Sequence, residues 1–583
     1  MGSADTVSLV RTPKSNRPED GTGEDGLWRA FPGEDPVAAQ QAVCESIARI
    51  LASNLSRAGQ LDALLRLDRR AQELYTQLLN RYVEGNAQLR LFERKVWVSA
   101  LRLSQAFYQA YENFYRHVQS TSDVHFLAHA HSIVVQLFHH RRIEFLLRYF
   151  RFKKRIPAQC KELREAYRFA QSRGTTTQVV VSREGSDQRE VPTTPEEQYV
   201  RLLLLDMMNN GQFSPRELLW ADGWFGQWCK LVRLQTHEPA AETGAIQKYL
   251  ALDPDGTQGL KRTADVAVDD LLLIDPSPLL VRIAEETRLL RESASMHHTL
   301  SLAERTGRVA LLIKLKPIVD PNGLILERRG ERKRVALTVQ VIFGLSNIIR
   351  VLREEAKTRP RDGSGSESAT EGITITPFSA QPHSPAIDVG GTVTLAFTSM
   401  GNSPGTAPVV WQVKDRSDSG SRLRGKIDDL NRVIPGSLIA IRQAENGPWT
   451  VTVVRRLRRL VVDYVEIGVE HLGHRPRFVK LAAESAGIPG VNGSAPSTQR
   501  CFAALYLPPS DRHPKMPIKT LLLPTHEFRS NCNVTLLSSN STYTLRLNEP
   551  IQQQYEFVWT SFTVVDKAHP SSDTNRVAEE ARK

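Results

Sequence analysis

The strongest constraint on the fold is the segment from Pro408 to Arg477, in which apolar and polar residues alternate over four successive runs. In one of these runs Trp449, Val451 and Val453 fall on one face, directly after a turn signal at Asn446-Gly447-Pro448. Alternation with a period of two is typical of half-buried antiparallel strands, and several such strands in succession favour a small barrel or sandwich. The segment therefore predicts an antiparallel β-domain.

A D-x-S-x-x-G string lies at the start of this segment. It reads Asp415-Arg416-Ser417-Asp418-Ser419-Gly420 and directly follows the alternating run Val409 to Lys414. Asp415 supplies a hydrogen-bond acceptor and Ser417 supplies a small hydroxyl. Gly420 allows the backbone to approach a ligand closely because it has no Cβ. The string is therefore a candidate half-site at a strand end.

A basic stretch upstream supplies a second candidate half-site. It contains Arg328, Arg329, Arg332, Lys333 and Arg334, immediately before the strand-like run Val335 to Val341. Arg328 and Arg332 form an R-x-x-x-R pair, and the neighbouring cations offer alternative pairs. The planar fork of arginine makes two parallel hydrogen bonds to phosphate and can also bind a guanine edge. Together the two half-sites predict a site for a small anionic ligand that carries guanine.

These two strings in this order, with strand-like segments between and after them, resemble the PilZ domain, a bacterial receptor for cyclic di-GMP. The ending Ile467-Gly468-Val469-Glu470 adds to the resemblance. It implies a six-stranded antiparallel β-barrel that binds cyclic di-GMP on its outside, as a ligand and not as a catalytic cofactor. The ligand-binding residues that it implies are Arg328, Arg329, Arg332, Arg334, Asp415, Ser417 and Gly420.

Two further functions compete with a cyclic di-GMP receptor. The two strings are separated by an insertion at 354–406, which leaves open a degenerate PilZ-like adaptor that binds proteins but no nucleotide. The dense basic run Arg455-Arg456-Leu457-Arg458-Arg459 could attract the phosphates of the ligand, could form a nucleic-acid patch, or could be a solvated hairpin tip. We take binding of nucleic acid as the less favoured of these functions.

Composition limits the class of protein. A chain of 583 residues is too long for one core, and roughly three or four domains are expected. The net charge of +12 favours a phosphorylated or polyanionic partner. The five scattered cysteines form no C-x-x-C, which is typical of a reducing compartment. Neither a signal peptide nor an apolar run long enough to span a membrane is present, so we expect a cytoplasmic protein.

We expect a multidomain α+β chain, in which an all-α helical bundle or array precedes the PilZ-like barrel and a second small β-domain follows it. The predicted segments are a disordered N-terminus (1–35), a helical domain (36–240), a mixed α/β connecting region (241–322), the barrel (323–480) with its flexible insertion (354–406), a linker (484–500), the second antiparallel β-domain (501–567) and a polar tail (568–583).

Periodicity places the elements inside these segments. Leu64, Leu67, Ala71, Leu74, Leu78 and Tyr82 recur at the spacing of one helix face. Thr175 to Ser182 and the charged segment after it predict a hairpin or a loop insertion within the helical domain. Helices are expected again at Pro195–Asn210 and from Ser214 to about Val232. Strands of the second β-domain are predicted at Cys501–Leu507, Lys519–Leu523, Asn533–Ser538, Tyr543–Leu547 and Tyr555–Val565.

Other motifs in the sequence indicate no metal site and no catalytic site. Six histidines gather at His117, His125, His129, His131, His139 and His140, but without a thiol or an H-E-x-x-H they are interpreted as packing or surface residues. Gly401-Asn402-Ser403-Pro404-Gly405 matches the hydrolase elbow but is followed by a strand instead of a helix. No phosphate-binding loop of a nucleotide hydrolase is present. We therefore predict a non-enzymatic receptor, whose helical domain binds an unidentified protein partner.

Overall fold

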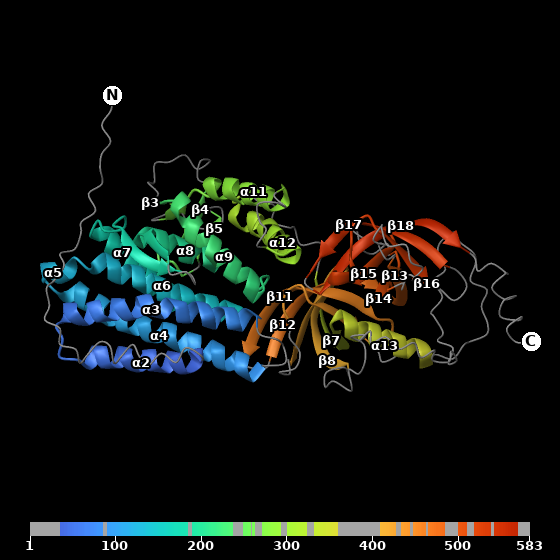
Figure 1. Ribbon diagram of the computed structural model, residues 1–583, viewed down its shortest axis with the longest axis horizontal. Helices are drawn as coiled ribbons and strands as arrows, with labels where there is room; N and C mark the ends of the chain where they lie inside the picture. The colour runs from blue at the N-terminus through green and yellow to red at the C-terminus, as the bar shows by residue number, and fades with distance from the viewer. Residues whose placement is uncertain are drawn as a thin grey trace, which may run out of the picture. The chain divides into compact units, whose positions relative to one another are not determined.

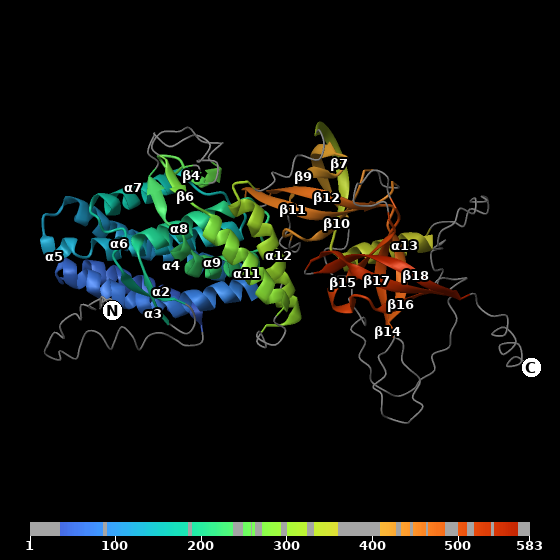
Figure 2. The same cartoon turned by 90° about the horizontal axis from the view of Figure 1, so that it is seen from above.

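A computed structural model describes the elements of the chain (Figures 1 and 2). The described residues are 35–84, 90–184, 189–236, 249–257, 259–262, 271–292, 300–322, 332–358, 408–426, 433–443, 447–461, 464–483, 500–509, 518–537, 542–554 and 556–568. They form two compact units. The first unit comprises the described parts of 1–85, 91–140 and 180–192, and the second comprises the remainder.

The first unit is helical. Its elements are α2 (Pro36–Ala52), α3 (Arg57–Glu84), α4 (Arg90–Ser120), α5 (Val124–Leu127), the first half of α6 (Ala130–Phe150) and the hairpin of β1 (Val180–Glu184) and β2 (Arg189–Thr193). Helix α2 begins where the Asp35 carboxylate accepts a hydrogen bond from the Val37 N–H, with Pro36 in the first turn. All six apolar positions predicted for one face of α3 are buried. The predicted helix and hairpin are therefore confirmed.

The second unit begins with helices and a small sheet. These elements are the rest of α6, α7 (Pro157–Ser172), α8 (Pro195–Met207), α9 (Pro215–Trp228), η2 (Cys229–Leu231), β3 (Leu234–Thr236), β4 (Leu250–Leu252), β5 (Lys261–Arg262), β6 (Leu272–Ile274), α11 (Ser277–Glu292) and α12 (Leu302–Val319). A capping box between Ser214 and Glu217 fixes the start of α9, because each side chain satisfies a free N–H of the first turn. Strands β3 to β6 form one antiparallel sheet.

Two closed six-stranded antiparallel barrels follow in the second unit. The first contains β7 (Lys333–Phe343), β8 (Val409–Ser417), β9 (Gly420–Lys426), β10 (Leu438–Arg442), β11 (Thr450–Val461) and β12 (Tyr464–His474). The second contains β13 (Arg477–Ala483), β14 (Arg500–Leu507), β15 (Thr520–Pro524), β16 (Asn533–Leu537), β17 (Thr542–Gln553) and β18 (Phe557–Ala568), with η4 (Thr525–Glu527) after β15. The predicted fold class, a helical region followed by two antiparallel β-domains, is confirmed.

Each barrel has its own apolar interior. Trp411, Val413, Leu423, Val454 and Ile467 belong to the interior cluster of the first barrel. Residues of β13 to β17 fill the second. The inward positions are those that the alternating pattern selects, because successive residues of a strand point to opposite faces. The core therefore follows directly from the period of two in the sequence.

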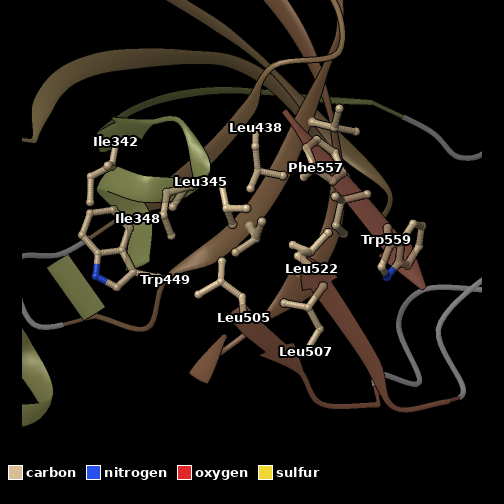
Figure 3. Close-up of a cluster of buried hydrophobic side chains, with 14 residues drawn as sticks. Ile342, Leu345, Ile348, Leu438, Trp449, Leu505, Leu507, Leu522, Phe557 and Trp559 are labelled. Atoms are coloured by element: carbon tan, nitrogen blue, oxygen red, sulfur yellow. The ribbon is translucent and has the colours of Figure 1, made fainter. Parts of the chain in front are cut away.

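A third apolar cluster joins the two barrels through helix α13 (Leu345–Thr358). Figure 3 shows Leu345 and Ile348 of this helix gathered with Trp449 of the first barrel and with Leu505 and Phe557 of the second. The helix contacts β7 and β10 on one side and β13 and β14 on the other. The two barrels consequently share buried surface in addition to their separate interiors.

Two features differ from the predicted segment limits. The predicted insertion at 354–406 starts inside α13, where Glu355 accepts hydrogen bonds from Arg442 at 2.7 Å and from the Trp449 indole at 3.1 Å. The predicted first β-domain ended at residue 480, whereas β13 pairs with β14 and β16 of the second barrel. A turn at Arg475 with φ of 52° separates β12 from β13 and redirects the chain without interrupting the strand-like pattern. The other domain limits stay predictions.

Candidate anion-binding site on the first barrel

The D-x-S-x-x-G string forms the hairpin between β8 and β9. Ser417 and Gly420 are opposite each other in the two strands, so that Asp418 and Ser419 form a two-residue turn. The Ser417 hydroxyl donates a hydrogen bond to the carbonyl of Gly420 at 3.3 Å. A two-residue connection is the shortest common hairpin loop. The string thus encodes a tight turn as well as a set of polar groups.

Gly420 is required by the barrel itself. A Cβ at this position would lie 2.3 Å from the carbonyl oxygen of Val469 in β12. Real Cβ atoms do not come so close to a backbone oxygen, and a backbone atom of a paired strand cannot move aside easily. The absence of a Cβ at Gly420 therefore allows β9 to lie close to the backbone of β12. Its predicted contact with a ligand stays a prediction.

His471 of β12 holds the tip of this hairpin. Its backbone N–H donates to the carbonyl of Ser419 at 2.9 Å. Its Nδ1 lies 3.3 Å from the carbonyl of Asp418, and its Nε2 lies 3.1 Å from the hydroxyl of Ser421. Because a carbonyl can only accept, Nδ1 carries the proton and Nε2 accepts from Ser421. The motif search did not single out His471, since no local pattern links it to a hairpin fifty residues upstream.

Asp415 is turned to the outside of the barrel by a β-bulge. Upstream of the bulge Val413 faces the interior opposite Leu423, whereas downstream of it Asp415 is opposite Arg422. Directly opposite residues of antiparallel strands share a face. Asp415 and Arg422 therefore lie on the same outer face, and the extra residue of the bulge is Lys414.

Two arginines cover the Asp415 carboxylate, whose residue is only 5% exposed. Its Oδ1 accepts from Arg332 at 3.0 Å, and its Oδ2 pairs with Arg422 at 2.6 Å. The two arginine side chains are themselves 50% and 41% exposed. The basic arm and the hairpin motif, 83 residues apart, are thus brought together at one carboxylate.

The other residues predicted for the site have different positions. Arg334 is exposed and lies opposite Asp415 in β7, on the same outer row. Ser417 lies at the end of β8, where its hydroxyl bonds Gly420. Arg328 and Arg329 lie outside the described residues. Which pair of arginines binds a ligand stays a prediction.

The outer row continues beyond the predicted residues. Across the strands it runs from Arg334 to Asp415, Arg422, Gly468 and Arg456. The next row contains Gln412, Arg424, Glu466 and Arg458. We call this outer surface the arginine face, defined by Arg332, Arg334, Arg422, Arg424, Arg456 and Arg458. Its cations outnumber its two carboxylates, Asp415 and Glu466, so the surface attracts anions.

Arg422 and Arg424 were missed by the motif search. A signal existed, because the run Gly420 to Lys426 alternates basic residues with Ser421, Leu423 and Gly425. Arg422 reaches Glu466 at 3.5 Å in addition to Asp415, and the Arg424 guanidinium lies 5.8 Å from the centre of the Tyr464 ring. Exposed arginine and tyrosine planes are surfaces on which a base can stack.

The dense basic run Arg455 to Arg459 is divided by its strand. Leu457 faces the interior, while Arg456 and Arg458 belong to the arginine face. Arg455 instead pairs with Glu470 at 2.5 Å and donates to Gln552 of the second barrel at 2.6 Å. The run is therefore part of strand β11 and of its contacts, which excludes the interpretation as a solvated hairpin tip.

The histidines gathered in the sequence do not form a metal site within the described part of the chain. In the first unit, His140 lies 2.7 Å from the Asp68 carboxylate and His139 lies 3.0 Å from the amide oxygen of Gln72, both fully enclosed. Burial raises the pKa of Asp68, but the charges and hydrogen bonds of His140 and its neighbours outweigh it and leave this pKa lowered. Burial also lowers the pKa of His131. His139 and His140 therefore make packing contacts in the core of the first unit.

Two further features carry no site. A cavity of about 10 Å³ lined by Cys160, Tyr199 and Asp206 is just large enough for one water molecule. Burial raises the pKa of the Cys160 thiol to about 12, so this thiol is not a nucleophile near neutral pH. The elbow-like string from Gly401 to Gly405 lies outside the described residues.

Comparison with known proteins finds a similarity in the helical region. Residues 27–240 match the family described as cyclic-di-GMP receptor FimW, N-terminal domain. The matched segment includes the helices from α2 to α9 and neither of the barrels. No curated protein and no solved structure matches the chain. In the part of the chain that the structure describes, no helix combines the length and the apolar character that a membrane crossing requires.

Proposed function

We propose that this chain, whose residues 27–240 carry the N-terminal domain of a cyclic-di-GMP receptor family, binds cyclic di-GMP on the arginine face of its first barrel. The observation that carries the proposal is the meeting of the two predicted half-sites at Asp415, which contacts Arg332 of the arm and Arg422 beside the hairpin. The helical segment and the barrel thus point independently to the same ligand.

The energetics of the site are sufficient for this ligand. A hydrogen bond to a charged group contributes about 1.5–3 kcal/mol, and micromolar binding needs about 8 kcal/mol. Two arginine forks on phosphate together with one stacked base reach that range. Asp415 also holds Arg332 and Arg422 in place before the ligand arrives, which reduces the entropy lost when they bind it.

The architecture supports the PilZ resemblance. The resemblance implies a six-stranded barrel with its ligand on the outside, and the arginine face lies on the outside of such a barrel. In this proposal Arg332, Arg334 and Arg422 contact the phosphates and guanine edges, while Asp415 and Ser417 hold a guanine from the hairpin side. Arg328 and Arg329 are assigned to the same site by the PilZ resemblance alone.

The remaining parts of the proposal concern what binding does. Ordering of the arm by the ligand would alter how the helical region meets a protein partner, because a ligand shifts a protein toward the state that it binds best. The family named by the match is a receptor and not an enzyme class. A non-catalytic role, a cytoplasmic location and the identity of the partner stay predictions.

Titration calorimetry with cyclic di-GMP tests the proposed site. We expect micromolar or tighter binding to the full chain, weakened at least about tenfold in Arg332→Ala, Asp415→Ala and Arg422→Ala. Arg288→Ala is the matched control, because it removes one exposed cation from α11, whose partner Glu292 is also exposed. This control should bind like the wild type, since an exposed ion pair of this kind contributes little.

The competing functions predict different results. Binding of GTP or of a short oligonucleotide as tight as that of cyclic di-GMP, falling steeply with salt, would favour a nucleic-acid protein over the receptor. If neither calorimetry nor a second method detected binding of cyclic di-GMP, the degenerate PilZ-like adaptor would become the favoured function. Equal affinity of all three variants and the wild type would overturn the site even if the nucleotide bound elsewhere.

A further inference from the structure

The outer row of the arginine face reaches the loop between α8 and α9. In this row Gly468 lies between Arg422 and Arg456 and carries no side chain, so no side chain of β12 separates the two arginines. Arg456 is exposed, and no carboxylate pairs with it among the described residues. It is therefore a cation of the face that is still available for an anionic ligand.

Arg456 is currently held by a neutral partner. The Gln212 side-chain amide lies against its guanidinium, and the amide orientation that suits both groups turns the oxygen toward Arg456, where it accepts from Nε at 2.9 Å and from Nη2 at 3.1 Å. A guanidinium has five N–H donors, so three remain for other acceptors. Hydrogen bonds to a charged acceptor are about twice as strong as bonds between neutral groups. A phosphate that reached Arg456 would consequently compete well with the Gln212 amide.

The loop that carries Gln212 (residues 208–214, the α8–α9 loop) is fitted closely to β11. Its Gly211 has a φ of 73°, and its carbonyl accepts from the N–H of Leu457 at 2.8 Å. A Cβ on Gly211 would lie 2.2 Å from the Leu457 carbonyl oxygen. The Asn210 side chain accepts from the Gln212 N–H at 3.0 Å and fixes the turn. A movement of Arg456 would therefore also move this loop.

Both ends of the loop lead into anchored helices. On one side the carboxylate of Asp206, near the end of α8, accepts hydrogen bonds from Arg155 and from the Tyr149 hydroxyl. On the other side Glu217 at the start of α9 pairs with Lys314 of α12 at 2.5 Å. Residues 208–214 also fall within the matched segment 27–240. The loop is thus hydrogen-bonded to strand β11 of the arginine face and continuous in the chain with α8 and α9.

From these contacts we infer that Arg456 is a further phosphate-binding residue of the receptor, and that a phosphate of the nucleotide displaces Gln212 as its hydrogen-bond acceptor. Release of Gln212 loosens the α8–α9 loop from β11, so that occupation of the barrel is transmitted to α8 and α9. This inference rests on the proposed function, because it assigns a residue and a regulatory contact to the same site.

Calorimetry of full-length variants tests the exchange. Arg456→Ala should bind cyclic di-GMP about ten- to a hundredfold more weakly, because one charge-assisted contact is lost. Gln212→Ala should bind about three- to tenfold more tightly, because the competing acceptor is removed. The double variant should match Arg456→Ala alone, since Gln212 acts only through Arg456. Arg288→Ala again controls for the loss of one exposed charge.

Hydrogen exchange supplies a second readout. In the wild type, saturation with cyclic di-GMP should speed exchange in peptides from the α8–α9 loop, and Arg456→Ala should lose this response. The inference is overturned if Arg456→Ala or Gln212→Ala binds within twofold of the wild type, or if exchange in the loop does not change. In that case weakening by Arg332→Ala would still support the proposed function. Absence of binding to the wild type would overturn both.

Discussion

The two barrels have the same topology and different outer surfaces. When the strands of each barrel are numbered 1 to 6 in chain order, their order around the barrel is 1-2-3-6-5-4. Strand 4 pairs with strand 1 and closes the barrel. In the first barrel the second and third strands carry Asp415 opposite Arg422. In the second barrel the corresponding strands pair Leu505 with Leu522, which are both buried in the cluster around α13.

The residues that close a barrel are therefore distinct from the residues that could bind a ligand. Both barrels close because alternate residues fill an apolar interior, and this requirement leaves the outward positions free. The first barrel places arginines at those positions and re-aims Asp415 with a bulge. The second barrel uses Leu505, Leu507 and Leu522 in the cluster that it shares with α13. We therefore expect the first barrel to bind and the second to support it.

Truncation of one interior side chain in each barrel is the strongest test of this division. Trp411→Ala in the first barrel and Phe502→Ala in the second should each lower the free energy of unfolding by about 3–5 kcal/mol, because both side chains are buried in their cores. Chemical denaturation measures this loss. Below the unfolding transition, calorimetry should show impaired binding of cyclic di-GMP only for Trp411→Ala.

The opposite pattern of binding would break the comparison. If folded Phe502→Ala lost its affinity for cyclic di-GMP while Trp411→Ala kept it, the ligand would belong to the second barrel. Loss of affinity in both folded variants would mean that the two barrels bind as one unit. The shared cluster around α13 is the surface through which that dependence would act.

A smaller effect is expected at the hairpin between β8 and β9 of the first barrel. Gly420→Ala should destabilise the protein by about 1–3 kcal/mol, because its Cβ would meet the Val469 carbonyl oxygen at 2.3 Å. Ser417→Ala is the control from the same turn and should cost about 0.5–1.5 kcal/mol, the value of one hydrogen bond. Urea denaturation of both variants measures the difference. Equal stability of Gly420→Ala and the wild type would refute the structural role of this glycine.

The smallest expected effect concerns pH and the support that the second barrel gives to the first. Burial raises the pKa of the Glu556 carboxyl, and hydrogen bonds from the N–H groups of Leu345 and Leu438 oppose this shift without cancelling it. A raised pKa in the folded state means that the folded protein binds the proton more tightly than the unfolded chain. The resulting stability is complete below the unfolded pKa of about 4.3 and is lost as the pH rises through the folded value.

Denaturation of the wild type and of Glu556→Gln at several pH values measures this contribution. Between about pH 4 and pH 7 the wild type should become less stable relative to the variant, which has no proton to lose at this position. Parallel stability curves for the two proteins would show that the Glu556 carboxyl titrates alike in the folded and unfolded states. The contact between Glu556 and the start of α13 would then contribute nothing that depends on pH.

Much of the secondary structure could be predicted because it depends on local patterns. The helix spacing from Leu64 to Tyr82 and the strand candidates after Cys501 correspond to observed elements. The hairpin at Asp415 to Gly420 follows from turn chemistry within six residues. The alternating run from Gly420 to Lys426 places Arg422 on an outer face, but its pairing with Asp415 depends on the bulge at Lys414, which has no sequence signature.

The sequence by itself determined that two antiparallel β-domains follow a helical region, since the periods of 3.6 and 2 are written in neighbouring residues. It also predicted that Arg332 and Asp415 lie together, and the structure pairs these two side chains. Only the tertiary structure decided that β13 leaves the first barrel and that Arg456 shares an outer row with Asp415. The physical reason is that strand register and closure depend on pairing between residues far apart in the chain, which no local pattern encodes.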